Sequence, residues 1–176
     1  AFGKKVVFED LGLEIRRRET ITIIGGSGSG KSVLLKCLIG LLYPDQGAIW
    51  LEDTDVTQLE ELKMREVRRR VAMVFQGSAL FDSLSVGENI AYPLREQMPD
   101  LSYEQVAEKV ALNLKRVNLP GIEAMKPSDL SGGMRKRVGL ARAIATDPEV
   151  ILWDEPTTGL DPISTRIIDE LIVSMK

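Results

Sequence analysis

The stretch Gly25-Gly26-Ser27-Gly28-Ser29-Gly30-Lys31-Ser32 decides the fold of this 176-residue chain. It is a complete GxxxxGK[ST] loop, in which glycines let successive backbone N–H groups turn towards a phosphate. Lys31 adds a positive charge that reaches the β- and γ-phosphates, and Ser32 offers its hydroxyl to Mg²⁺. The apolar segment Ile21–Ile24 before the loop is predicted to be a buried strand, and Val33–Leu42 after it a buried helix. The motif therefore predicts a nucleotide phosphate site at the start of a helix.

The composition is that of a soluble globular protein with one domain, since 44% of the residues are hydrophobic and 28% are charged. A net charge of −3 provides no general attraction to nucleic acid, so no nucleic acid is expected among the partners. The single cysteine, Cys37, cannot form an internal disulfide, which agrees with a reducing cytosol. No apolar run approaches the roughly 18–20 residues that span a bilayer. Because Ala1 is not a Met and Lys176 lies on a helical pattern, we expect the chain to continue beyond both ends.

Strand and helix patterns alternate along the chain, which favours a mainly parallel sheet. Further strands are predicted over Ala48–Leu51, Val71–Phe75 and Val150–Trp153, and further helices over Leu59–Arg70 and near Ser164–Met175. Between residues 77 and 145 the pattern is only helical, with helices predicted over Val86–Tyr92, Tyr103–Val117 and Ser131–Ala145. We interpret residues 77–145 as a helical subdomain inserted into a core formed by residues 1–76 and 146–176.

Two carboxylates, Asp154 and Glu155, follow the apolar strand Val150–Trp153. Buried acids are costly unless they are paired with a metal ion or a proton donor. Beside a phosphate loop, Asp154 would lie near Mg²⁺, and Glu155 would polarise the water that attacks the γ-phosphate. The alternative is a strand that ends at the solvent, with acids that cap the next segment. The presence of the phosphate loop favours the first interpretation.

A second glycine-rich helix start lies at Leu130–Met134, with the sequence LSGGM. Ser131 is predicted to be an N-cap, and Gly132 and Gly133 leave the first helical N–H groups accessible to an anion. The helix has an apolar stripe formed by Met134, Val138, Ala141 and Ala145. Its basic residues lie largely off the stripe, at Arg135, Lys136, Arg137 and Arg142. On propensity alone, a plain capped helix with a solvated basic face is the preferred interpretation.

In this combination the motifs resemble the nucleotide-binding domain of ABC ATPases over nearly the whole chain. LSGGM matches the family signature, Gln76 the glutamine of the Q-loop, Asp161 the D-loop aspartate, and Phe2 the aromatic residue that stacks on adenine. The resemblance implies an α/β, P-loop NTPase fold with a mainly parallel sheet core and an inserted helical subdomain. It also implies binding of ATP and Mg²⁺, and ATP hydrolysis.

The resemblance further implies that two copies face each other head to tail as a homodimer. Each ATP would lie between Gly25–Ser32 of one copy and Ser131–Gly133 of the other. Glu155 and Gln76 would be catalytic, and Asp161 would couple the two sites. The metal ion would be held by Ser32, Gln76 and Asp154. In this interpretation Gln76 passes closure to an integral membrane permease, and the ATPase is peripheral on the cytoplasmic face of the inner or plasma membrane.

Two segments, Phe75–Asp82 and Asn89–Glu96, are similar to the ATPase subunits of Mla/Mce-type lipid transporters. This similarity implies transport of phospholipid or a related lipid, with a lipid-binding Mce-type protein among the partners. One alternative is the ATPase of an importer for amino acids or other small polar solutes. Another is a non-transport ABC ATPase that acts on ribosomes or DNA. Leu130–Met134 argues against a P-loop kinase or GTPase, and Glu155 argues against a module that only binds ATP.

The chain departs from the family pattern because it contains no histidine, whereas the family has a switch histidine beyond the D-loop. The chain stops shortly after Asp161, so we expect truncation rather than loss of this residue. In the family a later strand inserts between the strand before Gly25 and the strand before Asp154. Without it, strand edges would be open. We therefore expect the isolated 176-residue chain to be unstable or inactive.

Overall fold

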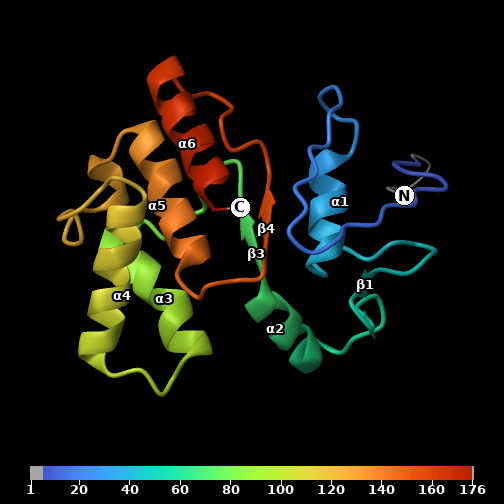
Figure 1. The fold of residues 1–176 in the computed structure, drawn as a ribbon, viewed down its shortest axis with the longest axis horizontal. Coiled ribbons are helices and arrows are strands. Elements are labelled where there is room, and N and C mark those ends of the chain that lie inside the picture. The colour runs from blue at the N-terminus through green and yellow to red at the C-terminus, as the bar shows by residue number, and fades with distance from the viewer. Residues whose placement is uncertain (1–5, 176) are drawn as a thin grey trace. The chain divides into compact units, whose positions relative to one another are not determined.

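Helices and a few short strands make up residues 6–175, the part of the chain that the computed structural model describes (Figure 1). The chain divides into a first unit that ends at Arg68 and a second unit that spans Arg69–Met175. Each unit is described by itself below. Phe2, the residue predicted to stack on adenine, lies outside the described residues. The division into a core and an inserted helical subdomain stays a prediction.

The first unit carries the glycine loop and the helix that follows it, α1 (Lys31–Leu38). Next comes a small antiparallel hairpin, formed by β1 (Trp50–Leu51) and β2 (Thr54–Asp55). Helix α2 (Glu61–Arg70) follows the hairpin. The buried apolar side chains of this unit are those of Ile39, Val56, Met64 and Val67. They give the unit a small core that ties α2 to the end of α1.

Three predictions for the first unit are corrected by the structure. Residues Ile21–Ile24 are not a strand, and Ile24 is 91% exposed. The segment has strand propensity, but among the described residues no strand pairs with it, and unpaired backbone does not form a strand. The strand predicted over Ala48–Leu51 is shorter and consists only of β1, which pairs antiparallel with β2.

The helix predicted over Val33–Leu42 is α1, which begins two residues earlier, at Lys31, and ends four residues earlier, at Leu38. It is half-buried rather than buried. Its end is set by Gly40, which has a positive φ of 64°. A Cβ at Gly40 would lie 2.6 Å from Cε of Met64. The positive φ is what favours glycine here, because the end of the Met64 side chain could move, and a residue in this conformation terminates a helix.

The second unit is built on two parallel strands, β3 (Val71–Val74) and β4 (Val150–Trp153). Val71 pairs with Val150 and Val74 with Trp153. Between the strands the chain forms α3 (Val86–Gln97), α4 (Tyr103–Arg116), the short 3₁₀ turn η1 (Pro127–Asp129) and α5 (Gly132–Ile144). Helix α6 (Pro162–Ser174) follows β4. These elements confirm the predicted strands and helices of this region, with shifts of one or two residues at most ends. The exception is the helix predicted over Val86–Tyr92, which continues through Pro93 to Gln97.

Side-chain caps determine where the helices of the second unit begin. Ser85 and Ser102 each form a capping box, with Glu88 and Gln105 respectively. Such boxes satisfy backbone donors that a helix start leaves without partners. Asp161 caps α6, and Pro162 occupies the first turn of that helix.

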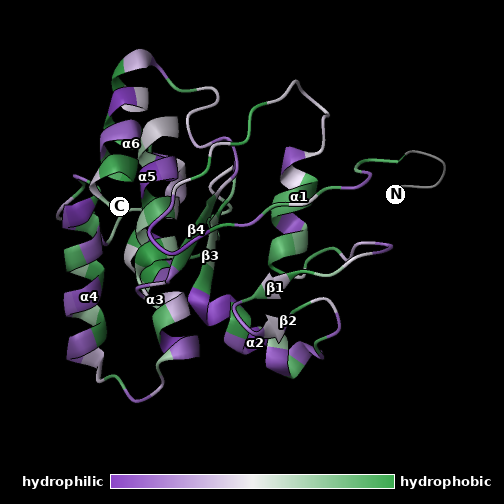
Figure 2. Cartoon of the chain, turned by 45° about the vertical axis from the view of Figure 1, so that its right-hand side comes forward, coloured by the Kyte–Doolittle hydropathy of each residue, from purple (hydrophilic) through white to green (hydrophobic). Residues whose placement is uncertain are grey.

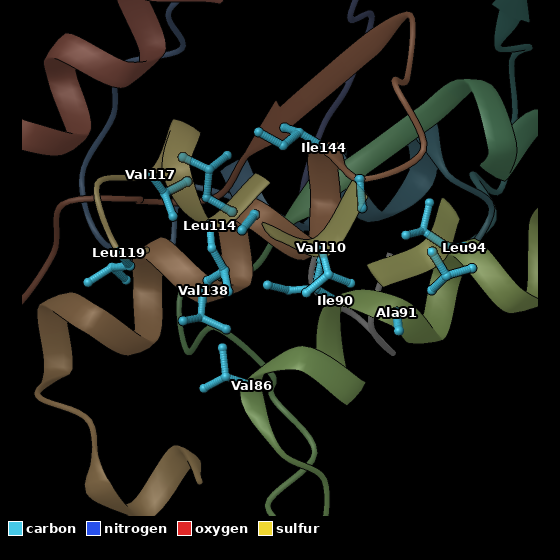
Figure 3. Packing of buried hydrophobic residues seen from close by; sticks show 14 of the residues in the cluster. Val86, Ile90, Ala91, Leu94, Val110, Leu114, Val117, Leu119, Val138 and Ile144 are labelled. Carbon is cyan, nitrogen blue, oxygen red and sulfur yellow. The ribbon is translucent and has the colours of Figure 1, made fainter. Parts of the chain in front are cut away.

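The core of the second unit lies where α3, α4 and α5 pack together and against β3 (Figures 1 and 3). Val86, Ile90, Leu94, Leu114 and Val138 are completely buried there. Hydrophilic and hydrophobic residues alternate along the turns of α4, as expected for a helix with one face on the core (Figure 2). Within the described residues, no helix combines the length and the apolar character that crossing a membrane would require.

Replacement of Leu114 by alanine should destabilise the second unit, because this side chain is fully buried between the helices. We expect Leu114→Ala to lower the free energy of unfolding by about 2–5 kcal/mol, measured by urea denaturation of the full-length protein. Leu112, on the same helix, is 49% exposed and serves as the matched control. Equal losses for Leu114→Ala and Leu112→Ala would contradict the core described here.

Candidate active site

The glycine loop of the first unit has the conformation that its sequence predicts. Gly28 and Gly30 have positive φ angles of 75° and 99°, and Gly30 is the N-cap of α1. A Cβ at Gly30 would lie 2.6 Å from Cζ of Phe8, so the position excludes any larger residue. The ammonium of Lys31 donates to the carbonyl oxygens of Gly25 and Gly26, at 2.9 and 3.1 Å. An exposed loop of this kind at a helix N-terminus suits a phosphate.

In the second unit, the carboxyl ends of β3 and β4 bring three of the predicted site residues together. The ladder between the strands continues past Trp153, where the N–H of Asp154 donates to the carbonyl oxygen of Val74 at 3.0 Å. One step further, Nε2 of Gln76 donates to Oε2 of Glu155 at 3.1 Å. In α/β proteins, ligands bind at the carboxyl ends of parallel strands. Gln76, Asp154 and Glu155 therefore lie where such a ligand would bind.

Glu155 has an unusual backbone, since its φ of 48° lies in the left-handed region. This conformation costs a non-glycine residue about 1–3 kcal/mol, and it persists where the surroundings hold it. A second donor holds the same carboxylate oxygen, because Oε2 also accepts a hydrogen bond from Oγ1 of Thr158 at 3.1 Å. Asp154, next to it, is buried with 6% of its surface exposed. The two acids therefore differ: Asp154 is enclosed, and Glu155 is partly accessible and fixed in direction.

These residues fit the donor set that Mg²⁺ uses in nucleotide sites. Within residues 6–175, no group of three or more acidic, cysteine or histidine side chains is arranged to hold a metal ion. Mg²⁺ at nucleotides commonly takes one or two protein oxygens together with phosphates and waters, so a cage of acids is not required. The carboxylate of Asp154 and the amide oxygen of Gln76 provide oxygen ligands of this kind. The assignment of Ser32, Gln76 and Asp154 to the metal ion stays a prediction.

The second glycine-rich helix start has the cap that its sequence predicts. Oγ of Ser131 accepts a hydrogen bond from the N–H of Met134 at 3.2 Å, and α5 begins at Gly132. Ser131 and Gly132 are exposed, whereas Gly133 is buried. A Cβ at Gly133 would lie 2.6 Å from Oγ of Ser164 on α6. The start of α5 is therefore accessible at its tip and packed closely against α6 one residue later.

Asp161 is the N-cap of α6. Its Oδ1 accepts hydrogen bonds from the N–H groups of Ile163 and Ser164, both at 3.0 Å, and its Oδ2 from Oγ of Ser164 at 2.7 Å. The bonds from Ser164 hold the pKa of Asp161 below its usual value. Through Ser164, Asp161 is connected to the buried Gly133 of α5. The proposed coupling role of Asp161 between two copies stays a prediction.

Three of the four basic residues of α5, namely Lys136, Arg137 and Arg142, are half-buried rather than solvated, which corrects the interpretation favoured by propensity alone; Arg135 is exposed. Each side chain donates to backbone carbonyl oxygens of another segment or of the helix entry. The accepting carbonyls are those of Leu130 for Arg135, Pro156 and Thr158 for Lys136, Val117 and Asn118 for Arg137, and Ser78 and Ala79 for Arg142. The N···O distances are 2.6–3.2 Å. Helix α5 is thus bonded to the segments that follow Gln76 and Glu155.

Two residues that order the segment after Gln76 were missed by the sequence analysis. Asn89 is fully buried, and its amide bonds the N–H and carbonyl of Phe81 at 2.8 and 3.1 Å. The guanidinium of Arg142 also lies 5.7 Å from the centre of the Phe81 ring, which packs against Tyr92. Asn89 could have been found from the sequence, because it is a polar residue within the apolar face of a helix. No sequence signal distinguished Arg142 from the other basic residues of α5.

Comparison with known proteins identifies the relatives of this chain. The ABC transporter family model matches residues 8–158. The chain is 43% identical over 172 residues to MlaF of Haemophilus influenzae, the ATP-binding protein of an intermembrane phospholipid transport system. It is 42% identical over 175 residues to mkl of Mycobacterium leprae, a probable ribonucleotide transport ATP-binding protein. These matches cover 97% and 99% of this chain, which spans 64% and 50% of the length of the two relatives.

A solved structure shares the fold. It is a dimeric ATP-binding cassette in a post-hydrolysis state, bound to ADP and Pi. The TM-score is 0.88 at 32% sequence identity, and the match covers 94% of this chain and 73% of that one. The predicted α/β, P-loop NTPase fold is therefore confirmed.

The contact between α5 and α6 allows a matched test with two neighbouring glycines. A Cβ at Gly132 meets nothing within 4 Å, whereas one at Gly133 would collide with Ser164. We expect Gly133→Ala to destabilise the full-length protein by about 1–3 kcal/mol through this overpacking. Gly132→Ala should be neutral or stabilise by about 0.5–1 kcal/mol, as alanine does in a helix. Thermal unfolding measures both, and equal midpoints would contradict the close packing at Gly133.

Proposed function

The chain belongs to the ABC transporter family, and on this premise we propose that it hydrolyses ATP to power the transport of phospholipid or a similar lipid. The observation that carries the catalytic part is the 3.1 Å hydrogen bond between Gln76 and Glu155, at the carboxyl ends of two parallel strands and beside the buried Asp154. Gln76 is the residue that would respond to the nucleotide, and its amide directly fixes the carboxylate that would act on water.

In the proposed reaction Glu155 accepts a proton from the attacking water, which strengthens the water as a nucleophile. The loop Gly25–Ser32 binds the phosphates through backbone N–H groups, and Lys31 offsets negative charge on the β- and γ-phosphates. Ser32, Gln76 and Asp154 would hold Mg²⁺, which supplies positive charge to the phosphate oxygens. The bonds from Gln76 and Thr158 keep the Glu155 carboxylate directed before substrate binds.

We further propose that two copies share each ATP, with Ser131–Gly133 of one copy facing the phosphate loop of the other. The exposed tip of α5 supports this arrangement, because the N-terminus of a helix attracts an anion and Ser131 and Gly132 leave it accessible. The similar solved cassette is described as dimeric and bound to ADP and Pi, which agrees with a nucleotide-dependent pair. The γ-phosphate would then hold the two copies together until hydrolysis removes it.

The lipid assignment is supported by the similarity to MlaF, which is named for intermembrane phospholipid transport. In that case the partners are an integral permease and a lipid-binding Mce-type protein, and the ATPase is peripheral on the cytoplasmic face of the membrane. A second candidate is transport of a small polar solute. The comparable similarity to mkl, named for probable ribonucleotide transport, favours it. The two candidates share one hydrolytic apparatus and differ in the permease.

Replacement of the proposed base tests the catalytic part. Because Glu155→Gln keeps the shape of the side chain and removes its basicity, we expect ATP binding to survive and turnover to fall about 100-fold or more. Steady-state phosphate release and binding of a fluorescent ATP analogue by the full-length protein measure the two properties. Glu108→Gln, an exposed change on α4, is the control and should retain turnover. Unchanged turnover in Glu155→Gln would remove this residue from the mechanism.

Isolation of the intact transporter tests the substrate. We expect the full-length ATPase to purify with its permease from detergent extracts, and mass spectrometry of the complex to detect bound phospholipid. ATP hydrolysis by the reconstituted complex should rise when phospholipid is supplied and should not respond to ribonucleotides other than its ATP substrate. Stimulation by a ribonucleotide other than ATP, without retained lipid, would instead support the second candidate.

A further inference from the structure

One side chain ties helix α5 to the loop that follows β4. Nζ of Lys136 donates to the carbonyl oxygens of Pro156 and Thr158, at 3.1 and 2.6 Å. These carbonyls lie in the loop 155–161, which starts at Glu155 and ends at Asp161. An ammonium group has three donors and no acceptor, so it can gather several carbonyl oxygens at one point. Lys136 is therefore placed to determine where this loop lies relative to α5.

The loop 155–161 needs support from outside itself. It begins with Glu155 in the left-handed backbone conformation, which is unfavourable for a residue with a side chain. Its internal backbone bonds are long, at 3.3 Å from the N–H of Thr158 to Glu155 and 3.2 Å from the N–H of Leu160 to Thr157. The bonds from Lys136 end on carbonyl oxygens within these overlapping turns and come from a helix that is anchored in the core.

The nearby carboxylate of Glu155 offsets part of the cost of burying this lysine. Burial lowers the pKa of Lys136, and the negative charge of Glu155 opposes that shift. The half-buried ammonium thus has two carbonyl oxygens as hydrogen-bond partners and a carboxylate as a nearby opposite charge. Loss of the ammonium would leave the carbonyls of Pro156 and Thr158 without this donor.

A second contact from α5 reaches the other end of the same loop. Gly133 packs against Ser164, and Ser164 bonds the Asp161 carboxylate at 2.7 Å. Lys136 lies one helical turn after Gly133, on the same helix. Helix α5 therefore contacts the loop directly through Lys136, and it reaches Asp161 at the end of the loop through Ser164.

We propose that Lys136 is a positioning residue, which holds the loop 155–161 against α5 so that the Glu155 carboxylate stays within hydrogen-bond reach of Gln76. The inference rests on the proposed function, because it takes Glu155 to be the residue that acts on water. It adds a connection within one copy. Ser131, the N-cap of α5, would face the partner copy's nucleotide, and Lys136 on the same helix is bonded to the loop that begins at the copy's own Glu155.

Three substitutions at Lys136 test the role in the full-length ATPase. Lys136→Met keeps most of the side-chain length and removes the donors, so kcat should fall about 10- to 100-fold through misplacement of Glu155. The KM for ATP should change less than about twofold, since the loop 155–161 does not form the phosphate cradle. Lys136→Arg and Lys136→Gln retain donors, and both should recover a large part of kcat. Lys115→Met removes an exposed lysine on α4 and should leave kcat unchanged.

The outcomes separate this inference from the proposed function. An unchanged kcat in Lys136→Met, or equal losses in the Met, Gln and Arg variants, would overturn the positioning role. An increase in KM without a fall in kcat would also overturn it. If the Met variant does not fold, judged by circular dichroism, the comparison of Gln and Arg with wild type decides, and loss of kcat in both overturns the role. Turnover that survives Glu155→Gln would overturn the proposed base itself, whereas loss in Glu155→Gln with full activity in Lys136→Met would reject only the inference.

Discussion

The second unit depends on the parallel pairing of β3 with β4. The two strands are far apart in the sequence and adjacent in space, and their register sets Phe75 and Gln76 beside Asp154 and Glu155. A one-residue change of register would move every side chain of one strand to the opposite face. The hydrogen bond between Gln76 and Glu155 is a direct result of this pairing. The proposed catalytic residues therefore owe their contact to backbone hydrogen bonds between apolar strands.

Helix α5 bonds to the two segments that follow β3 and β4. Its apolar stripe lies in the core, and its basic side chains extend to carbonyl oxygens in the segments after Gln76 and after Glu155. Carbonyl oxygens in turns and loops often have no backbone donor, and a charged donor from a rigid helix satisfies them strongly. A single helix thus positions both segments that flank the proposed site. The same helix presents the glycine-rich tip at which a partner's phosphate would bind.

Much of the second unit could be predicted from the sequence, because its signals are local. Ser85, Ser102 and Ser131 mark helix starts with a side chain that accepts from nearby N–H groups, and the apolar periodicity of α4 and α5 identifies their buried faces.

The first unit was predicted less well. Ile21–Ile24 has the composition of a strand, but a strand also needs a neighbour, which no property of the four residues themselves supplies. The end of α1 had a local signal in Gly40, whose positive φ stops the helix, and the predicted helix ran past it.

The sequence by itself determined which motifs the proposed chemistry rests on: the phosphate loop, the two acids after an apolar strand and the glycine-rich helix start are short patterns that can be recognised from residue types alone. Tertiary structure alone decided how the basic residues of α5 are used. Read along the chain, Arg135, Lys136, Arg137 and Arg142 are charges off an apolar stripe, and solvent is their simplest environment. Their actual partners are carbonyl oxygens, which every residue has, so no pattern of side chains could identify them before the chain was folded.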